Sequence, residues 1–272
     1  MKFRSASAVA MLAAASLTLA ACGGDSDSGS GDKVKIGIKF DQPGLGFKDG
    51  SKYTGFDVAV AKYVAGKMGY KENQIEWVQS PSKQRESMLK AGTVKMIFAT
   101  YSITDKRKKE VAFAGPYFVA GQSVLVRADS KINDVAGLKG KKVCSVTGST
   151  SVDNLKKEQP NLVPQEYDTY SACASALNDG VIDAMTTDDT ILAGYANQTA
   201  YKGKFKLVGN TFSTEKYGVG LKQGDTDTCK KVNTAIQEMV KDGSWEKALK
   251  DNLGADYKFN AESNPPKAFE AC

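Results

Sequence analysis

Short apolar runs typical of β-strands alternate along the chain with stretches in which apolar residues recur at helical spacing. Helices are predicted at residues 56–68, 85–90, 152–158, 172–177, 191–196, 226–240 and 245–252. Strands are predicted at residues 34–38, 75–78, 96–99, 123–126, 143–146, 183–186, 205–208 and 217–221. This alternation predicts an α/β architecture. A break near residues 118–122 separates two such series, so we expect two lobes.

Residues 1–21 have a different pattern, because a short basic region with Lys2 and Arg4 precedes an apolar stretch of small residues. This order is typical of a secretory signal, and the stretch is shorter than the ~20 residues that span a bilayer. The sequence Leu-Ala-Ala directly before Cys22 resembles a lipoprotein processing box, in which that cysteine becomes the lipidated first mature residue. The alternative is an ordinary signal with a cysteine at its boundary by chance.

Residues 23–32 contain only Gly, Asp and Ser. A segment of this composition cannot bury a core, which favours a flexible tether. Together with a lipidated Cys22, the tether predicts a protein that is lipid-anchored on the extracytoplasmic face of the cell membrane.

The remaining cysteines are Cys144, Cys173, Cys229 and Cys272. An even number in an exported chain indicates two disulfides, for which three connectivities are possible. Proximity in the sequence favours Cys144–Cys173 and Cys229–Cys272, each stabilising the fold by about 3–4 kcal/mol in the loop-entropy account. Free buried thiols are the alternative.

Composition narrows the possible chemistry. The chain contains no histidine and no Cys-x-x-Cys pair, which argues against histidine-dependent catalysis and most metal sites. The net charge of +6 is mild, and the basic residues are scattered without a basic–aromatic platform, so nucleic acid is not an expected partner. We therefore expect no catalytic residue, no metal and no cofactor, whereas a small acidic ligand fits the charge.

The stretch ATYSITDKR, residues 99–107, carries the most informative polar pattern. Thr100 and Ser102 follow a predicted strand, Thr104 stands where a helix N-cap belongs, and Arg107 comes three residues later. The free N–H groups of a helix start, together with a guanidinium fork, form a receptor for a carboxylate. A plain capped helix with a solvent-facing Arg107 is the alternative.

Two further segments end predicted strands with polar residues. The turn TGSTS, residues 147–151, offers cap oxygens and amide donors through Ser149, Thr150 and Ser151. The segment DAMTTDD leads to Asp188 and Asp189, and one carboxylate there can hold an ammonium group. The alternative is a helix cap, which suits Asp189 better than Asp188.

Several longer motifs resemble those of the polar amino-acid family of solute-binding proteins, which serve ATP-driven importers. In order they are GFDVAVAKYVAGKMG, IFATYSITDKRKKEVAFAGPY, LKGKKVCSVTGST, LNDGVIDAMTTDD, YGVGLKQGD and VKDGSW. The resemblance covers essentially all of residues 34–252. It is closest to the actinobacterial glutamate-binding lipoproteins, which share the motifs DQPGLGF, ATYSIT, CSVTGST and YDTYSAC.

The resemblance implies the two-lobed type II fold of periplasmic binding proteins, in which two crossover strands join α/β lobes around a ligand cleft. Mapped here, it implies a first lobe of residues 33–119 and 217–258, a second lobe of residues 120–216 and a C-terminal tail of residues 259–272. The crossings are expected near residues 119–120 and 216–217.

The resemblance also implies a ligand site. Arg107 matches the arginine that grips the ligand α-carboxylate, and Asp188 matches the acid that receives the α-ammonium group. The hydroxyl residues that match further polar partners are Thr100, Ser102, Ser149 and Thr150. Each pole of a zwitterion then meets an opposite charge or a helix end when the lobes close.

Two cations bear on the identity of the ligand. Lys39 falls where many binders of cationic and neutral amino acids carry Asp, so we expect it to pair with an acidic ligand side chain; a surface lysine at a strand end is the alternative. Arg85 is a second candidate cation unless its helix points it to solvent. These residues predict glutamate as the ligand, with aspartate as the alternative.

The expected function is therefore non-enzymatic: a monomeric binding protein that delivers glutamate to the membrane permease of an ABC importer. Two alternatives use the same fold. One is a sensor subunit that presents its ligand to a receptor kinase. The other is a cyclohexadienyl dehydratase-like enzyme, which needs a poised acid or base in the cleft, and Asp188 is the residue available for that role.

Overall fold

Two five-stranded sheets organise the part of the chain that the computed structural model describes, residues 33–254 and 257–272. In spatial order, the first sheet contains β5 (Ile75–Gln79), β1 (Val34–Ile38), β6 (Met96–Phe98), β13 (Glu215–Leu221) and β7 (Ala112–Ala120). The second contains β10 (Gln165–Tyr167), β9 (Val143–Val146), β11 (Ala184–Asp188), β8 (Gln122–Arg127) and β12 (Phe205–Val208). The predicted secretory signal, Cys22 and tether fall in residues 1–32, outside the described residues.

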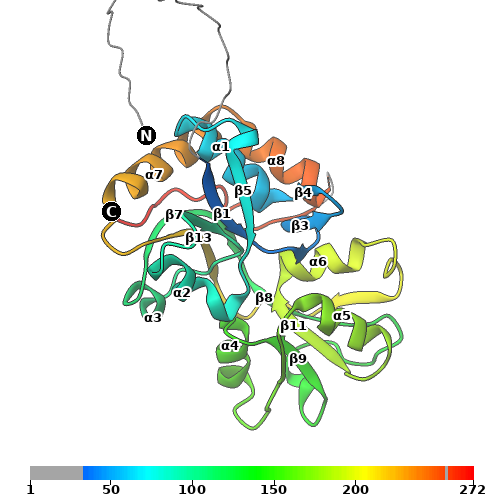
Figure 1. Cartoon of the computed structure of the whole chain (residues 1–272). Helices are drawn as coiled ribbons and strands as arrows, with labels where there is room; N and C mark the ends of the chain where they lie inside the picture. Colours follow the sequence, from blue (N-terminus) through cyan, green and yellow to red (C-terminus); the bar gives the residue numbers. More distant parts are fainter. Residues whose placement is uncertain (1–32, 255–256) are drawn as a thin grey trace, which may run out of the picture. The chain divides into compact units, whose positions relative to one another are not determined.

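Helices cover both sheets (Figure 1). Those packed with the first sheet are α1 (Phe56–Lys67), α2 (Arg85–Lys90), α3 (Asp105–Lys108), α7 (Thr226–Lys241) and α8 (Ser244–Leu253). Those packed with the second are α4 (Thr150–Glu158), α5 (Tyr170–Asn178) and α6 (Asp189–Asn197). We call each sheet with its helices a lobe. Within residues 33–254 and 257–272, no helix has both the length and the apolar character that a membrane crossing requires.

A small antiparallel sheet belongs to the first lobe. It consists of β2 (Asp41–Gln42), β3 (Gly46–Asp49) and β4 (Lys52–Thr54), and it leads directly into α1. Short 3-10 turns at Glu72–Gln74, Ser82–Gln84 and Ala136–Leu138 complete the connections.

Strand direction brings the polar segments together. β1 runs parallel to β5 and β6, and β9 runs parallel to β10 and β11. Parallel strands end at the same edge of a sheet, which is where open α/β folds bind ligands. Lys39 follows the end of β1, Thr100 follows β6 and Asp188 ends β11. The fold therefore delivers the predicted polar residues to the inner edges of the two sheets.

Two paired strands connect the lobes. β7 and β13 run antiparallel from Ala112 opposite Leu221 to Ala120 opposite Glu215. Only Gly121 separates β7 from β8. A glycine fits here because a Cβ at this position would lie 2.6 Å from the Cβ of Thr211. The break expected at residues 118–122 is therefore a nearly continuous strand that passes from one sheet to the other.

The sequence pattern located most other elements but missed β7 along with β2, β3, β4 and β10. β7 contains Gly115 and Pro116, residues that normally interrupt a strand. The structure accommodates them where the pairing with β13 shifts register, between Tyr217 and Val219. Because the strand pairing is interrupted here, the proline, which has no N–H, does not have to donate a ladder hydrogen bond.

Two disulfides join sequence-distant elements. Cys144 of β9 pairs with Cys173 of α5, and Cys229 of α7 pairs with Cys272. The pairing favoured by sequence proximity is thus confirmed, and the alternative of free thiols is wrong.

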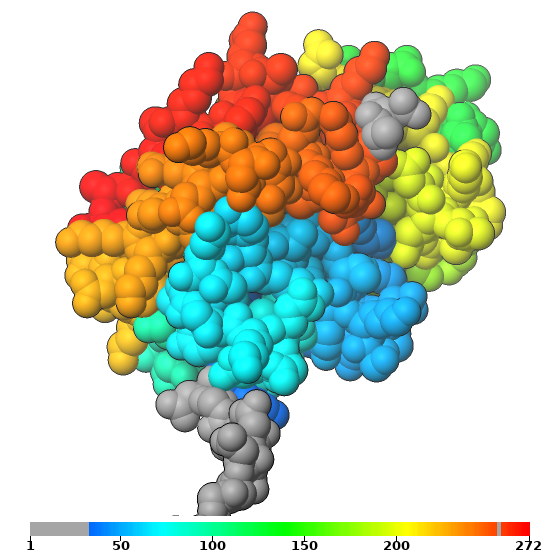
Figure 2. Space-filling view, turned by 90° about the horizontal axis from the view of Figure 1, so that it is seen from above, coloured from blue at the N-terminus to red at the C-terminus, as the bar shows by residue number. Residues whose placement is uncertain are grey.

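The C-terminal tail packs on the first lobe. Figure 2 shows the last residues (red) beside α7 and α8 (orange). The ring of Phe259 lies 5.7 Å from that of Trp245 and 6.5 Å from that of Phe118. Residues 257–272 contain no helix or strand, as predicted, and the disulfide at Cys272 fixes their end.

Candidate functional site

A small cavity lies where the inner edges of the two lobes meet. The lining residues are Ser82, Arg85, Thr100, Arg107, Ser149, Thr150, Ser151, Tyr170, Asp188 and Ile191. Six of the eight residues predicted for a ligand site are among them. The other two lie directly behind the lining: Lys39 Nζ donates to Ser82 Oγ at 2.9 Å, and the hydroxyls of Ser102 and Thr150 are 3.4 Å apart.

Arg107 bridges the lobes beside this cavity. Thr104 caps α3 by accepting a hydrogen bond from the Arg107 N–H, which confirms the predicted cap. The guanidinium donates to Ser102 O at 2.7 Å and to Gly148 O at 3.0 Å. It is 7% exposed and lies over the ring of Tyr101. The alternative of a solvent-facing arginine is therefore wrong.

Arg85 and Lys39 add two more buried cations. Each is 2% exposed, so Arg85 does not point to solvent and Lys39 does not lie at the surface. Arg85 Nη1 donates to Ala99 O at 3.0 Å, while its Nε has no hydrogen-bond partner among the described residues. Burial and the charge of Arg107 lower the pKa of Arg85 to about 10. Burial and the charge of Arg85 lower the pKa of Lys39 to about 8.

Two carboxylates lie on the opposite side, Asp188 in the cavity lining and Glu215 behind it. Tyr217 donates its hydroxyl to Asp188 Oδ2 at 2.7 Å, and Asp188 Oδ1 is buried with no partner among the described residues. Burial, followed by the charge of Glu215, raises the pKa of Asp188 well above its usual range. Glu215 accepts from Thr150 Oγ1 at 2.9 Å and from Asn154 Nδ2 at 2.6 Å. The cavity is thus polarised, with cations on one side and an unsatisfied carboxylate oxygen on the other.

Thr100 occupies a strained turn that Asp57 holds in place. Its φ of 44° lies in the left-handed region, which typically costs a non-glycine residue about 1–3 kcal/mol. Asp57 Oδ2 accepts the Thr100 N–H at 3.0 Å, and Asp57 Oδ1 accepts the Tyr117 hydroxyl at 2.7 Å. Burial raises the pKa of Asp57 to about 6, and these two hydrogen bonds oppose the rise. Asp57 is therefore a positioning residue for this wall of the cavity.

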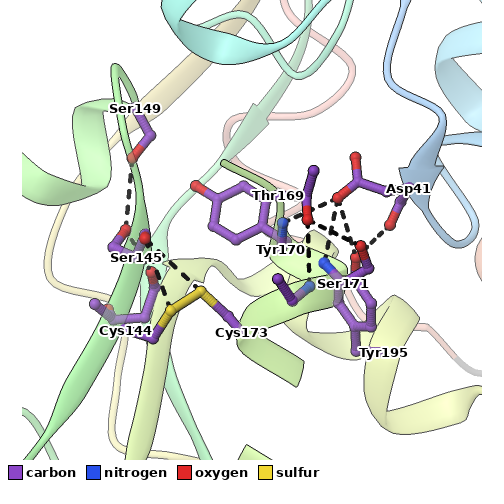
Figure 3. The surroundings of a disulfide bond; sticks show 11 residues. Asp41, Cys144, Ser145, Ser149, Thr169, Tyr170, Ser171, Cys173 and Tyr195 are labelled. Atoms are coloured by element: carbon purple, nitrogen blue, oxygen red, sulfur yellow. Dashed lines mark hydrogen bonds between the residues drawn. A yellow bond between two sulfur atoms is a disulfide. The ribbon is translucent and has the colours of Figure 1, made fainter. Parts of the chain in front are cut away.

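The turn at residues 147–151 faces the cavity from the second lobe. Gly148 has φ 80°, and a Cβ there would lie 2.8 Å from Lys83 Cα, so only glycine permits this approach of the two lobes. Ser149 is the N-cap residue of α4, and its hydroxyl lies 3.5 Å from that of Ser145 (Figure 3). The start of α4 thus directs its free amides and positive dipole end toward the cavity.

A larger open groove adjoins the cavity and shares Ser82, Arg107, Ser149 and Thr150 with it. Its other lining residues are mostly exposed charged side chains of both signs. We interpret this groove as the outer mouth of the same site.

Several lining or supporting residues were given no role from the sequence: Asp57, Ser82, Tyr170, Ile191 and Glu215. Asp57 stood in the GFD motif and Tyr170 in the YDTYSAC motif without an assigned role. Only the fold brings Tyr170 to the cavity and Glu215 to Thr150 beside it. Among the described residues, no cluster of side chains has a composition suited to hold a metal ion.

Comparisons with known proteins give the family. The pattern of bacterial extracellular solute-binding proteins, family 3, matches residues 34–255. The chain is 42% identical to the glutamate-binding protein GluB of Corynebacterium efficiens, over 96% of this chain and 95% of that protein. It is 37% identical to the ABC transporter glutamine-binding protein GlnH of Bacillus subtilis, over 83% of this chain and 82% of that protein.

A solved structure of an ancestral arginine-binding protein bound to arginine has a TM-score of 0.75 and 34% identity. The match covers 82% of this chain and 98% of that one, which confirms the expected α/β, two-lobed type II fold. The chain therefore belongs to the bacterial extracellular solute-binding proteins of family 3, and it is an extracytoplasmic binding protein rather than an enzyme.

Proposed function

We propose that this protein captures L-glutamate between its lobes and delivers it to the membrane permease of an ABC importer. The observation that carries the proposal is the charge arrangement of the cavity. Among the described residues, the buried cations Arg85 and Arg107 line the cavity together with Asp188, whose Oδ1 is unsatisfied, and the buried Lys39 lies directly behind the lining. A ligand with two carboxylates and one ammonium group complements this set.

Each charged group of glutamate has a candidate partner. Arg107 offers a fork for the α-carboxylate, with Thr100, Ser102, Ser149 and Thr150 around it. Asp188 Oδ1 accepts from the α-ammonium group. Lys39, whose only hydrogen-bond partner among the described residues is Ser82, is left for the side-chain carboxylate, with Arg85 beside it. An ammonium buried against a lone hydroxyl is costly until an anion joins it.

Glutamine is the second candidate, because a 37% identical relative is a glutamine-binding protein. Its amide oxygen can accept from Lys39, but it leaves the lysine charge uncompensated. Aspartate also offers two carboxylates, although its shorter side chain places them differently relative to Lys39.

The mechanism requires no covalent step. Binding energy from the two lobes favours the closed form, and the permease recognises the protein in that form. We propose lobes of residues 33–119 with 217–258 and residues 120–216, a monomeric protein, and crossings through β7 and β13.

Titration calorimetry of residues 23–272 with glutamate, aspartate, glutamine and asparagine tests the ligand. We expect glutamate to bind most tightly, with glutamine at least about tenfold weaker because the Lys39 charge stays unpaired. Tighter binding of glutamine than glutamate would contradict the assignment, and no binding to any of the four would refute an amino-acid ligand of this class.

We also propose a lipid anchor at Cys22. Replacing Cys22 with serine is expected to release the protein from the membrane fraction into the medium, while the purified protein keeps its ligand affinity. Retention of the variant in washed membranes would show that another segment provides the attachment. Metabolic labelling with a fatty acid gives an independent measurement, and the label should be absent from the variant.

A further inference from the structure

Asp41 of β2 caps a helix that belongs to the other lobe. Its Oδ2 accepts the backbone N–H of Tyr170 at 2.9 Å and that of Ser171 at 3.2 Å, the first two residues of α5 (Figure 3). The hydroxyl of Tyr195, in α6, donates to the backbone oxygen of Asp41. One short segment of the first lobe is thus bonded to two helices of the second.

These contacts complete the start of α5. The side chain of its own N-cap residue, Thr169, accepts the backbone N–H of Ala172 and the hydroxyl of Ser171, but neither the N–H of Tyr170 nor that of Ser171. Without Asp41, the backbone N–H groups of Tyr170 and Ser171 would have no hydrogen-bond partner within the helix. The negative charge of Asp41 is also favourable at the positive end of the helix dipole. Because Asp41 and α5 lie in different lobes, these bonds exist only when the lobes are together.

The position of α5 is fixed on its own side. Cys173 stands in the first turn of the helix, and its disulfide to Cys144 ties that turn to β9 (Figure 3). The amides that Asp41 engages are therefore held rigidly in the second lobe. An ion pair of Lys83 with Asp168 joins the lobes nearby, but both side chains are largely exposed and the pair contributes little.

The same helix start also reaches the cavity. Tyr170 lines it with its ring, and Lys39 Nζ lies 5.8 Å from the centre of that ring. Asp41 itself is absent from the cavity lining. The bond between Asp41 and the Tyr170 N–H therefore links lobe closure to the wall of the cavity without contacting its interior.

We propose that Asp41 is a closure residue, which holds the two lobes together through the start of α5 and so slows ligand release without touching the ligand. This inference rests on the proposed function in so far as closure retains an amino acid. It assigns Asp41 a positioning role that does not depend on the ligand's side chain.

The test uses Asp41→Ala and Asp41→Asn in the full chain, with Asp225→Ala as the matched control. Asp225 caps α7 through the N–H of Thr228, and both belong to the first lobe. Dissociation rates and Kd are measured by stopped-flow and calorimetry for glutamate and glutamine. Small-angle scattering gives the radius of gyration of each protein without ligand.

We expect Asp41→Ala to raise Kd for both ligands by about tenfold, mainly through faster release, since it removes a charged helix cap. Asp41→Asn keeps one acceptor oxygen and should show about a threefold effect. Asp225→Ala should lower the melting temperature and leave Kd within about twofold of wild type.

Other outcomes overturn the proposal. Unchanged release rates for both Asp41 variants would show that the contact does not retain ligand. Tighter binding of glutamate alone would mean that Asp41 acts only by repelling an acidic ligand near Lys39. If neither amino acid binds to wild type, the proposed function fails, and scattering still tests Asp41 as a closure residue. A larger radius of gyration for Asp41→Ala than for wild type and Asp225→Ala supports that role, and equal radii refute it.

Discussion

Replacing Arg107 with alanine is expected to weaken the binding of every amino acid by at least about 100-fold. The guanidinium is buried, and it reaches both lobes through Ser102 O and Gly148 O. Its loss removes the proposed partner of the α-carboxylate, a group that all amino acids share, and also removes a bridge that favours closure. Calorimetric titration with glutamate and glutamine measures both affinities.

Arg127→Ala is the matched control for this variant. Arg127 also donates to two backbone oxygens, Leu177 O at 3.1 Å and Ile182 O at 2.8 Å, but it lies away from the cavity. We expect it to lose thermal stability and to keep its ligand affinity. Arg107→Lys keeps the charge without the planar fork and should show an intermediate loss. Near-normal affinity in a folded Arg107→Ala protein would overturn the proposed site.

Local sequence patterns predicted the helices and strands whose apolar residues recur at a regular spacing. The Thr104 cap three residues before Arg107 is a local arrangement, and the sequence located it because a helix start is determined within one turn. The strand at β7 was missed since Gly115 and Pro116 interrupt its pattern. Its pairing with β13 depends on a segment about a hundred residues away, which no local pattern reveals.

The candidate site divides in the same way. Arg107, Asp188 and the hydroxyl residues stand in short motifs at strand ends or helix starts, and these motifs together with the family resemblance made them predictable. Asp57 and Glu215 act through partners that are distant in sequence, so their roles depend on the assembled fold. The burial of Lys39 was predictable only through the resemblance, because a lysine at a strand end is usually exposed.

The buried cations also indicate why the site is poorly stabilised without an anion. Lys39 and Arg85 both have lowered pKa values, which means that the folded environment disfavours their charged forms. A cationic group whose pKa is lower in the folded protein than in the unfolded chain decreases the free energy of unfolding at neutral pH, where it is charged. Sites of this kind exchange folding stability for ligand recognition.

Lys39→Met is expected to weaken glutamate binding by about 100-fold while changing glutamine binding by less than about fivefold. Methionine matches the length of the side chain and removes the charge proposed to meet the ligand's second carboxylate. Glutamine has no such carboxylate, so it loses only a hydrogen bond. The ratio of the two affinities, measured by calorimetry at pH 7, is the decisive quantity.

The same substitution should raise the melting temperature of the ligand-free protein, because it removes a buried charge whose Nζ has Ser82 Oγ as its only partner within residues 33–254 and 257–272. Lys83→Met serves as control, since Lys83 lies near the outer mouth but is exposed and pairs with Asp168. It should leave both affinities and the melting temperature nearly unchanged. Equal losses for glutamate and glutamine in Lys39→Met would mean that Lys39 does not read the ligand side chain. Selection for an acidic ligand would then have to come from Arg85, a buried cation whose Nε has no partner in the described part of the chain.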